Sequence, residues 1–413
     1  MLKKNITLLI TVQLISLFGT HMSDFALGLY LYEKSHSLYL FSLISLFAIM
    51  PEVLLGPIMG HYVDTHNKKY IMLLGHFGAG MASMLILVLL HEGYGNIYGY
   101  LMLVTVSSFF NSLVFSSFNV LLGSEASKEE MKKLASFLQL GVSLVMILSP
   151  AVAASLLDSQ GIEFVFYIDI ATFSFALLVI ALIGFSTNVT DTEKLNSIES
   201  IKKGFVFIKE NELLWLSLVL FALIEFSMAQ VTVLITPLIL SISTKSALGM
   251  IMSISGVGML IGSVIPLVVD IHKNVLARIN SFAALQALIF LLAVFNVGVV
   301  EIAVGSFLFM VFGSLIGILN YTFWQENVEQ KIKGKVFGFR RSVMLLSLMA
   351  GYMLSAPNVH LMQTLLDTFP LIYRVIGTHT QPGIRLLFII NAFIIVAVVF
   401  VIHMKQRKIL EQV

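Results

Sequence analysis

The chain has 413 residues, of which 58% are hydrophobic and 12% are charged, and its mean hydropathy is +0.95. A soluble domain carries about a quarter charged residues, so this composition indicates a membrane protein with several spans. The net charge of +2 gives no indication of a nucleic-acid partner. The lack of cysteine excludes disulfides, thiolate metal sites and cysteine nucleophiles.

Continuous apolar runs of about 20 residues predict transmembrane helices, because that length crosses the hydrocarbon layer. The first run begins near the N-terminus without a small-residue cleavage site, so we interpret it as a retained span and not as a signal peptide. The predicted fold class is all-α and polytopic. Its twelve predicted spans are 6–33, 39–63, 70–90, 97–122, 134–157, 163–186, 213–242, 247–270, 277–295, 299–321, 335–357 and 383–404.

The positive charges indicate the orientation of the chain. With the N-terminus inside, 21 of the 25 Lys and Arg residues fall in inner segments. The outer side keeps Lys34, Lys245, Arg374 and Arg385. This bias follows the positive-inside rule and predicts that both termini lie on the cytoplasmic side of a cell membrane.

The longest inner connection, 187–212, divides the chain into two six-span halves, 1–186 and 213–413. Its apolar residues recur at helical spacing with lysines between them, which favours an amphipathic helix at the inner surface; a plain tether is the alternative. These residues are Ile198, Ile201, Phe205 and Ile208. The outer connection 358–382 contains Leu361, Leu365, Leu366 and Phe369, which predict a second interfacial helix or a loop without a special role.

The two halves contain an internal repeat. A shift of 206 residues places "GPIMGHYVDTH" on "GSVIPLVVDIH", so that Gly56 aligns with Gly262 and Asp64 with Asp270. Both copies end an even-numbered span on the predicted cytoplasmic side. The halves are therefore expected to be parallel repeats related by an axis along the membrane normal.

The first copy resembles a loop of a known family. "GHYVDTHNKK", from Gly60 to Lys69, is similar to the connection between spans two and three of the major facilitator superfamily. Thr65 stands where the family has a basic residue, and Asn67 stands at a glycine position, where a left-handed turn is expected. We predict a conformational gate in this loop, with a weaker second copy. Its residues would be Gly56, Gly60, Asp64, Lys68 and Lys69, with Gly262 and Asp270 in the repeat.

Three further stretches resemble the drug- and siderophore-exporting branch of that superfamily, which includes macrolide efflux proteins. They are "FALGLYLYEKSHSLYLFSLISLFAIMPEVLLGPIMG", "FYIDIATFSFAL" and "WQENVEQKIKGKVFGFRRSV". The resemblance implies two six-helix bundles and a central cavity lined by spans one, four, seven and ten. The fifth span departs from the antiporter pattern, because it reads "LSPAVAA" in place of Gly-Pro followed by glycines.

No enzyme motif accompanies the spans. The sequence contains no G-x-x-x-x-G-K-[ST] loop for nucleotide, and "HEGYG" lacks the second histidine of a zinc-protease motif. "GVGMLIG" lies inside a span and indicates close helix packing, including the four-residue spacing from Gly258 to Gly262. We therefore expect no enzymatic activity, cofactor or metal.

Intramembrane carboxylates are the candidates for proton coupling. Asp24 in span one and Glu225 in span seven lie inside apolar runs, where a charge costs about 2.5–3.5 kcal/mol on insertion scales and faces a cavity or a partner. His21 lies three residues before Asp24 on the same helical face, so the two could form a protonation pair. Alternatively, both lie in an outer vestibule and titrate normally. For Glu52 and Asp169 we favour structural roles.

Polar and aromatic residues at helical spacing predict the lining of the cavity. They are Gln13, Thr20, Asn111, Phe115, Asn119, Thr232, Asn320, Tyr321 and Trp324. Hydrogen bonding between helices would explain the same pattern. The combined prediction is a monomeric bacterial exporter of an amphipathic or drug-like compound, with protons as coupling ion and the lipid bilayer around it. The alternatives are a lipid-like or siderophore exporter, an uncoupled facilitator, and a receptor or assembly factor that does not transport.

Overall fold

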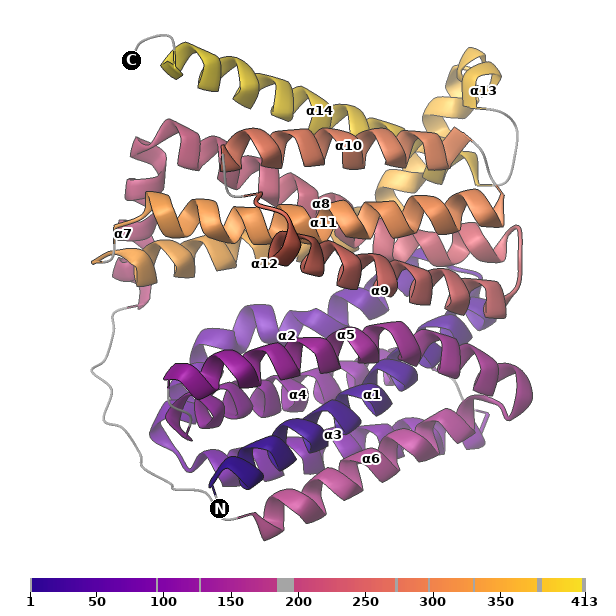
Figure 1. Cartoon of the computed structure of the whole chain (residues 1–413). Helices are drawn as coiled ribbons and strands as arrows, with labels where there is room; N and C mark the ends of the chain where they lie inside the picture. Colours follow the sequence, from indigo (N-terminus) through magenta and orange to yellow (C-terminus); the bar gives the residue numbers. More distant parts are fainter. Residues whose placement is uncertain are drawn as a thin grey trace. The chain divides into compact units, whose positions relative to one another are not determined.

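The computed structural model describes residues 2–93, 96–125, 128–183, 197–271, 274–295, 298–329, 331–376 and 381–410. Within its helices, the side chains of some residues, including Gly60, Asp64, Ile198 and Ile201, also lie outside the described part. The described residues form fourteen α-helices (Figure 1).

The chain divides into two compact units, Met1–Lys194 and Leu195–Val413. The first unit contains α1 (Leu2–Ser35), α2 (Leu38–Thr65), α3 (Lys68–His91), α4 (Ile97–Glu125), α5 (Lys128–Ser159) and α6 (Ile162–Leu182). The second contains α7 (Ser197–Glu210), α8 (Glu212–Leu240), α9 (Lys245–Val268), α10 (Val275–Phe295), α11 (Val299–Asn327), α12 (Lys333–Thr368), α13 (Leu371–Ile376) and α14 (Pro382–Leu410). The helix predicted within 187–212 corresponds to α7, which falls in the second unit.

Eleven helices within the described ranges are long and apolar enough to cross a membrane. The helix α10 adds a shorter apolar stretch, Val275–Ile289. The twelve predicted spans correspond in order to α1–α6, α8–α12 and α14. The predicted all-helical, polytopic fold is therefore confirmed.

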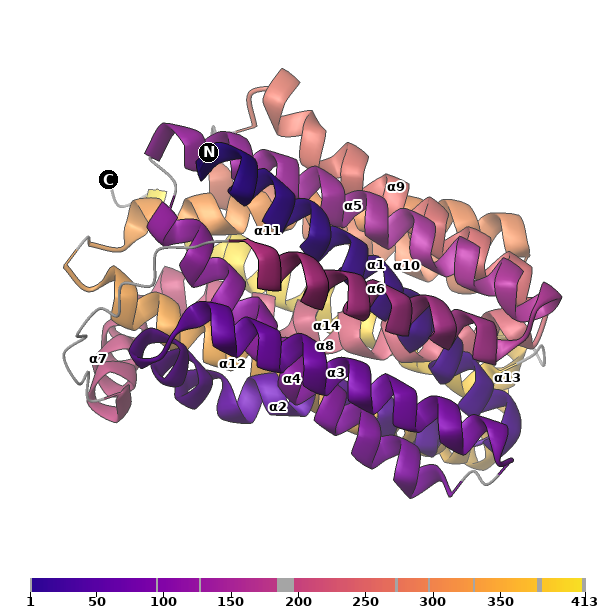
Figure 2. The same cartoon turned by 90° about the horizontal axis from the view of Figure 1, so that it is seen from below.

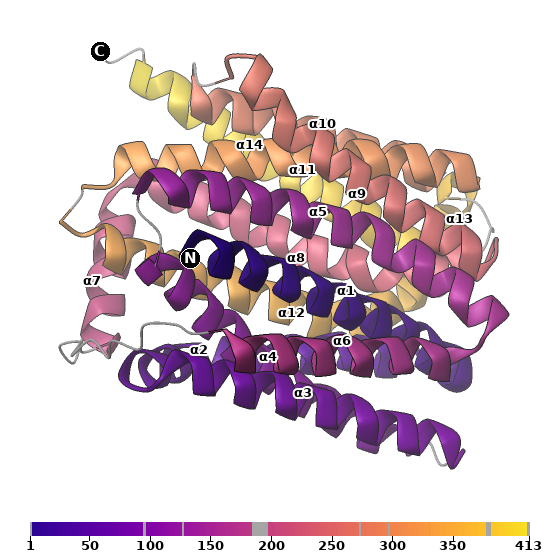
Figure 3. The ribbon, with the colours of Figure 1, turned by 60° about the horizontal axis from the view of Figure 1, so that its bottom comes forward.

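Both units use one pattern of helix pairing. In the first unit, α1 packs on α5 and α6, α2 and α3 pack on α4, and α3 packs on α6 (Figures 2 and 3). In the second unit, α8 packs on α12 and α14, α9 and α10 pack on α11, and α10 packs on α14. The two sets match when α1–α6 are aligned with α8–α12 and α14. The repeat read from the glycine–aspartate motif therefore extends to the tertiary structure of each unit.

Asn67 begins α3 by capping its free amide groups. Its Oδ1 accepts hydrogen bonds from the amides of Lys69 (3.1 Å) and Tyr70 (3.4 Å). The backbone of Asn67 is extended, with φ −68° and ψ 109°, so the expected left-handed turn is wrong. The residue has a different physical role: its side-chain oxygen satisfies amides that have no partner in the first turn of a helix.

The outer connection also differs from its prediction. The helix α12 continues past Pro357 to Thr368, so Leu361, Leu365 and Leu366 lie in its last turns and Phe369 follows its end, in place of a separate interfacial helix. The short helix α13 follows, and the Tyr373 hydroxyl donates to Asp367 Oδ1 (2.9 Å) at the end of α12. This hydrogen bond raises the pKa of Tyr373.

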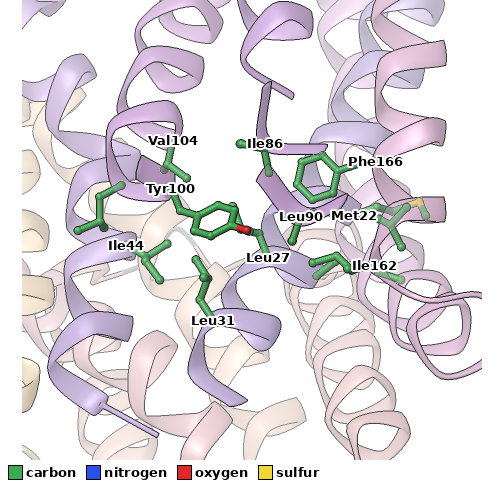
Figure 4. Close-up of a cluster of buried hydrophobic side chains, with 14 residues drawn as sticks. Met22, Leu27, Leu31, Ile44, Ile86, Leu90, Tyr100, Val104, Ile162 and Phe166 are labelled. Carbon is green, nitrogen blue, oxygen red and sulfur yellow. The ribbon is translucent and has the colours of Figure 1, made fainter. Parts of the chain in front are cut away.

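The first unit contains three clusters of buried apolar side chains, and two of them lie on either side of its polar level. One cluster includes Met22, Leu27, Ile86, Tyr100 and Phe166, and Figure 4 shows their side chains converging between the helices. The other lies nearer the N-terminal end of α1 and includes Leu9, Ile10, Met72, Val114 and Ile180. Polar side chains occupy the level between these clusters, at the middle of the helices.

Candidate substrate and proton site

A cavity of about 250 Å³ lies inside the first unit, between α1, α2, α3, α4 and α6. Leu27, Ile86, Val104 and Phe166 belong both to its lining and to the apolar cluster of Figure 4, so that cluster bounds the cavity. Six of the residues predicted from the sequence meet here: Gln13, Thr20, His21, Asp24, Asn111 and Phe115. Four of them lie on α1 and two on α4. Their helical spacing puts them on one face of each helix, and both faces border the cavity.

Asp169 on α6 is the most enclosed carboxyl of this cavity, with 1% of its surface exposed. Its Oδ2 accepts hydrogen bonds from the hydroxyls of Ser23 (2.9 Å) on α1 and Ser83 (2.7 Å) on α3. Its Oδ1 is buried and has no hydrogen-bond partner among the described residues. A Cβ added at Gly19 would lie 3.0 Å from this Oδ1, so the glycine lets α1 approach α6 closely. Asp169 therefore joins three helices through its carboxyl group.

Asp24 has a different environment in the same cavity. Its side chain is exposed to the cavity, and its charge interacts with that of Asp169. None of the hydrogen bonds among the described residues joins His21 to Asp24, although both line the cavity. Asp24 is thus accessible to water and protons, whereas Asp169 is held by serine hydroxyls.

Sequence reasoning missed a buried histidine beside this site. His76 on α3 is buried, and its Nδ1 lies 3.5 Å from the hydroxyl of Ser16, which lines the cavity. Within the described part of the chain its Nε2 has no hydrogen-bond partner, and its ring centre lies 6.0 Å from that of Phe173 in an edge-on arrangement. A signal was present, because His76 and Ser83 lie seven residues apart, on one face of α3.

The second unit places an intramembrane carboxylate and a half-buried guanidinium within range of each other's charge. Glu225 on α8 interacts electrostatically with Arg340 on α12. The Arg340 guanidinium lies 5.3 Å from the ring centre of Trp324 and 5.7 Å from that of Phe337. Arg340 was counted among the positive charges of an inner loop, but it is half-buried on α12 beside an intramembrane carboxylate. The need of Glu225 for a counter-ion was the signal that could have found it.

The other predicted cavity residues are dispersed. Asn119 is exposed and does not line the cavity of the first unit. Thr232 is exposed and donates to the carbonyl of Met228 on its own helix (2.9 Å). Asn320 and Trp324 are buried on α11, and each has one side-chain polar atom that finds no hydrogen-bond partner in the part of the chain that the structure describes. Tyr321, on the same helix, is 57% exposed and accepts a hydrogen bond from Gln325 (2.9 Å).

The predicted gate is described only in part. Gly60 and Asp64 lie on α2, but the surroundings of both residues are outside the described part. Lys68 is buried, and the Lys69 ammonium donates to the carbonyls of Ala181 and Ile183 at the end of α6, both at 2.8 Å. A Cβ at Gly56 would meet no atom within 4 Å, so Gly56 makes no close helix contact among the described residues.

The second copy of the motif has another structure. A Cβ at Gly262 would overlap the carbonyl oxygen of Val311, and one at Gly258 would overlap that of Phe307. The predicted small-residue packing between Gly258 and Gly262 is thereby confirmed, because α9 lies directly against α11. Asp270 is exposed, and its carbonyl accepts a hydrogen bond from Arg278 (3.1 Å).

Comparison with known proteins identifies the family. Residues 9–352 match the Major Facilitator Superfamily. The chain is 24% identical to macrolide efflux protein A of Streptococcus pyogenes over 358 residues, which cover 83% of this chain and 86% of the relative. It is 25% identical to the uncharacterized MFS-type transporter YfiS of Bacillus subtilis over 366 residues, which cover 84% and 85% of the two chains.

Solved structures agree on the fold. A mutant of the nucleoside transporter NupG superposes with a TM-score of 0.75 at 14% identity, over 98% of this chain and 99% of that one. A bacterial homologue of the iron transporter ferroportin, in an inward-facing state, superposes with a TM-score of 0.67 at 15% identity, over 97% of this chain and 99% of that one. The resemblance read from the sequence is confirmed: the chain belongs to the Major Facilitator Superfamily and is a multi-pass secondary transporter, not an enzyme.

Proposed function

We propose that this transporter exports an amphipathic or drug-like small molecule by proton antiport across a bacterial cell membrane. The observation that carries the proposal is the cavity of the first unit, which brings the carboxyls of Asp24, Glu52 and Asp169 together. His21 is the one basic side chain among the described residues that line it. The similarity to macrolide efflux proteins supports the direction and the substrate class.

Asp24 is the group that exchanges the proton in this proposal. It is exposed to the cavity, and a carboxyl in that setting can lose its proton to water and regain it when the site is filled or closed. His21 shares the cavity and acts with Asp24. Asp169 keeps the helices in register through its two serine bonds. Glu225 belongs to the same cycle through its charge interaction with Arg340.

The size of the cavity limits what it can take from the substrate. Pockets that enclose a drug-sized ligand measure about 300–1,000 Å³, whereas this cavity measures about 250 Å³. It therefore receives only a polar or basic part of a large molecule. Phe115, which is 52% exposed at its lining, offers an aromatic surface for the adjoining apolar part.

Inverted membrane vesicles with an imposed pH gradient test the proposal. A panel of a macrolide, a siderophore and a lipid-like amphiphile should show gradient-accelerated uptake of the macrolide or a similar drug. Flux that is indifferent to the gradient would identify a facilitator, and preference for another member of the panel would change the substrate class. Asp24→Asn should abolish the acceleration at equal protein levels, whereas Asp158→Asn, an exposed carboxylate at the end of α5, should preserve it. Full acceleration with Asp24→Asn would contradict the role of Asp24.

A further inference from the structure

The helix α7 is fixed to the second unit by one face. Ile208 is fully buried, and the ring of Phe205 lies 5.5 Å from Phe339 on α12 and 6.2 Å from Trp215 on α8. A Cβ at Gly204 would lie 2.5 Å from the carbonyl oxygen of Lys335, so only glycine allows this close approach to α12. Figure 1 shows α7 at one end of the second unit, beside the beginning of α12.

These contacts place α7 at the membrane boundary. The helix ends at Glu210, two residues before α8 begins, and both α8 and α12 are candidate membrane spans. Phe205 touches residues near the N-terminal ends of both spans, so the two spans start on the same side. The charge bias of the sequence predicts that this is the cytoplasmic side.

A groove of about 530 Å³ lies between α7 and the start of α12. Val206, Phe207 and Ile332 provide its apolar surface, and Val206 is 43% exposed. Three lysines border the apolar surface: Lys202, Lys203 and Lys335. Glu210 is the single acidic residue among the described residues of the lining. The groove thus combines an excess of positive charge with an apolar surface, and it lies at the level expected for the lipid headgroups.

This combination matches one class of ligand. A phosphate diester with acyl chains places its negative charge among ammonium groups and its glycerol and first methylenes on apolar side chains. A soluble phosphate would leave the apolar floor exposed to water, and a zwitterionic lipid would gain less from the lysines. We propose that the groove between α7 and α12 binds the headgroup of one anionic phospholipid of the inner leaflet, and that this lipid holds α7 in place. The proposal is independent of the substrate and of the coupling ion.

Lipid retention by the purified full-length protein tests this site. The protein in mild detergent is offered equal amounts of phosphatidylglycerol and phosphatidylcholine, and the bound lipid is counted by native mass spectrometry. The wild-type chain should retain phosphatidylglycerol preferentially. Each lysine near a membrane surface contributes roughly fivefold in affinity, so Lys202→Gln, Lys203→Gln and Lys335→Gln together should reduce the preference on the order of a hundredfold. Added salt should weaken it as well.

The matched control removes the same number of positive charges outside the groove. Lys34→Gln, Lys209→Gln and Lys331→Gln change three exposed lysines that do not line it, and this variant should retain the lipid as the wild type does. If the first triple variant does not fold, the double variant of the exposed Lys202 and Lys203 replaces it and should lose more than tenfold. The proposal is overturned by equal retention in the groove variant, by equal loss in the control, or by a wild type without preference. Displacement by millimolar glycerol 3-phosphate would also overturn it, since that result identifies a site for a soluble anion.

Discussion

The two units stabilise their intramembrane carboxyls in different ways. In the first unit, Asp169 is bonded by the neutral hydroxyls of Ser23 and Ser83. In the second unit, Glu225 interacts with the guanidinium of Arg340. Hydroxyl donors leave the charge of a carboxylate uncompensated, whereas an arginine balances it. The difference, on one pattern of helix pairing, supports placing the proton-exchanging group in the first unit, with Glu225 contributing to the same cycle from beside a compensating positive charge in the second.

Removing the counter-ion should have the largest effect. Arg340→Gln would remove the positive charge that acts on Glu225 together with the guanidinium contacts to Trp324 and Phe337, so the variant should be clearly less stable than the wild type. We expect a lower thermal unfolding midpoint in detergent, measured by fluorescence-detected gel filtration. The adjacent Arg341→Gln changes an exposed arginine and should shift the midpoint little.

The double variant Glu225→Gln with Arg340→Gln sharpens this prediction. Removing both charges eliminates the uncompensated group, so most of the lost stability should return. A double variant that is as unstable as Arg340→Gln alone would show that Arg340 acts through its contacts with Trp324 and Phe337 and not through its charge.

Replacement by alanine should change stability differently at the two glycines of the repeated motif, Gly262 and Gly56. Gly262→Ala would force a methyl group against the Val311 carbonyl on α11, and overpacking of this kind costs about 1–3 kcal/mol. Gly56→Ala places its methyl group in open space and gains helix propensity, so its stability should be unchanged or higher by up to about 1 kcal/mol. Unfolding midpoints of the two variants provide the measurement. Equal destabilisation at both positions would show that Gly56 makes a close contact after all.

The two serine bonds to Asp169 should differ in strength. Ser83 donates to Asp169 at 2.7 Å, so Ser83→Ala should cost about 1.5 kcal/mol, the value for a hydrogen bond to a charged group. The Ser23 hydroxyl also lies 3.0 Å from the Thr20 carbonyl, and a hydroxyl has one proton to donate. Ser23→Ala should therefore cost about half as much. Ser174→Ala, an exposed serine of α6 that bonds its own helix, is the control; a larger loss for Ser23→Ala than for Ser83→Ala would reverse this ranking.

The sequence predicts the spans well because hydrophobic length is a local property. The limits of the twelve runs fall within a few residues of most of the helices, and α12 is the main exception because Pro357 does not end it. Helical spacing also identified six residues that line one cavity, because the period of a helix shows which residues share a face.

Contacts between distant helices could not be read in this way. Asp169 looked like a packing residue because its partners, Ser23 and Ser83, lie 146 and 86 positions away. Arg340 looked like a loop charge because the start of α12 carries Lys333 and Lys335 before it. The spacing of His76 and Ser83 put both on one face of α3, but only the fold places Ser16 beside His76. Each of these roles depends on a neighbour that only the tertiary fold supplies.

The smallest effect is expected at the loop that first suggested a gate. The Lys69 ammonium joins the beginning of α3 to the last carbonyls of α6, whereas Arg278, near the start of α10 in the second unit, donates to the nearby Asp270 carbonyl. A cation at a helix C-terminus contributes about 0.3–1 kcal/mol, so Lys69→Met should lower stability by that amount.

If this contact belongs to a gate, as we propose, Lys69→Met should lower the maximal transport rate by roughly two- to fivefold, while the substrate concentration at half-saturation stays nearly constant. Asp64→Asn should act in the same direction, and Lys34→Met is the control. A changed half-saturation at a constant maximal rate would place these residues in substrate binding instead of in the conformational step.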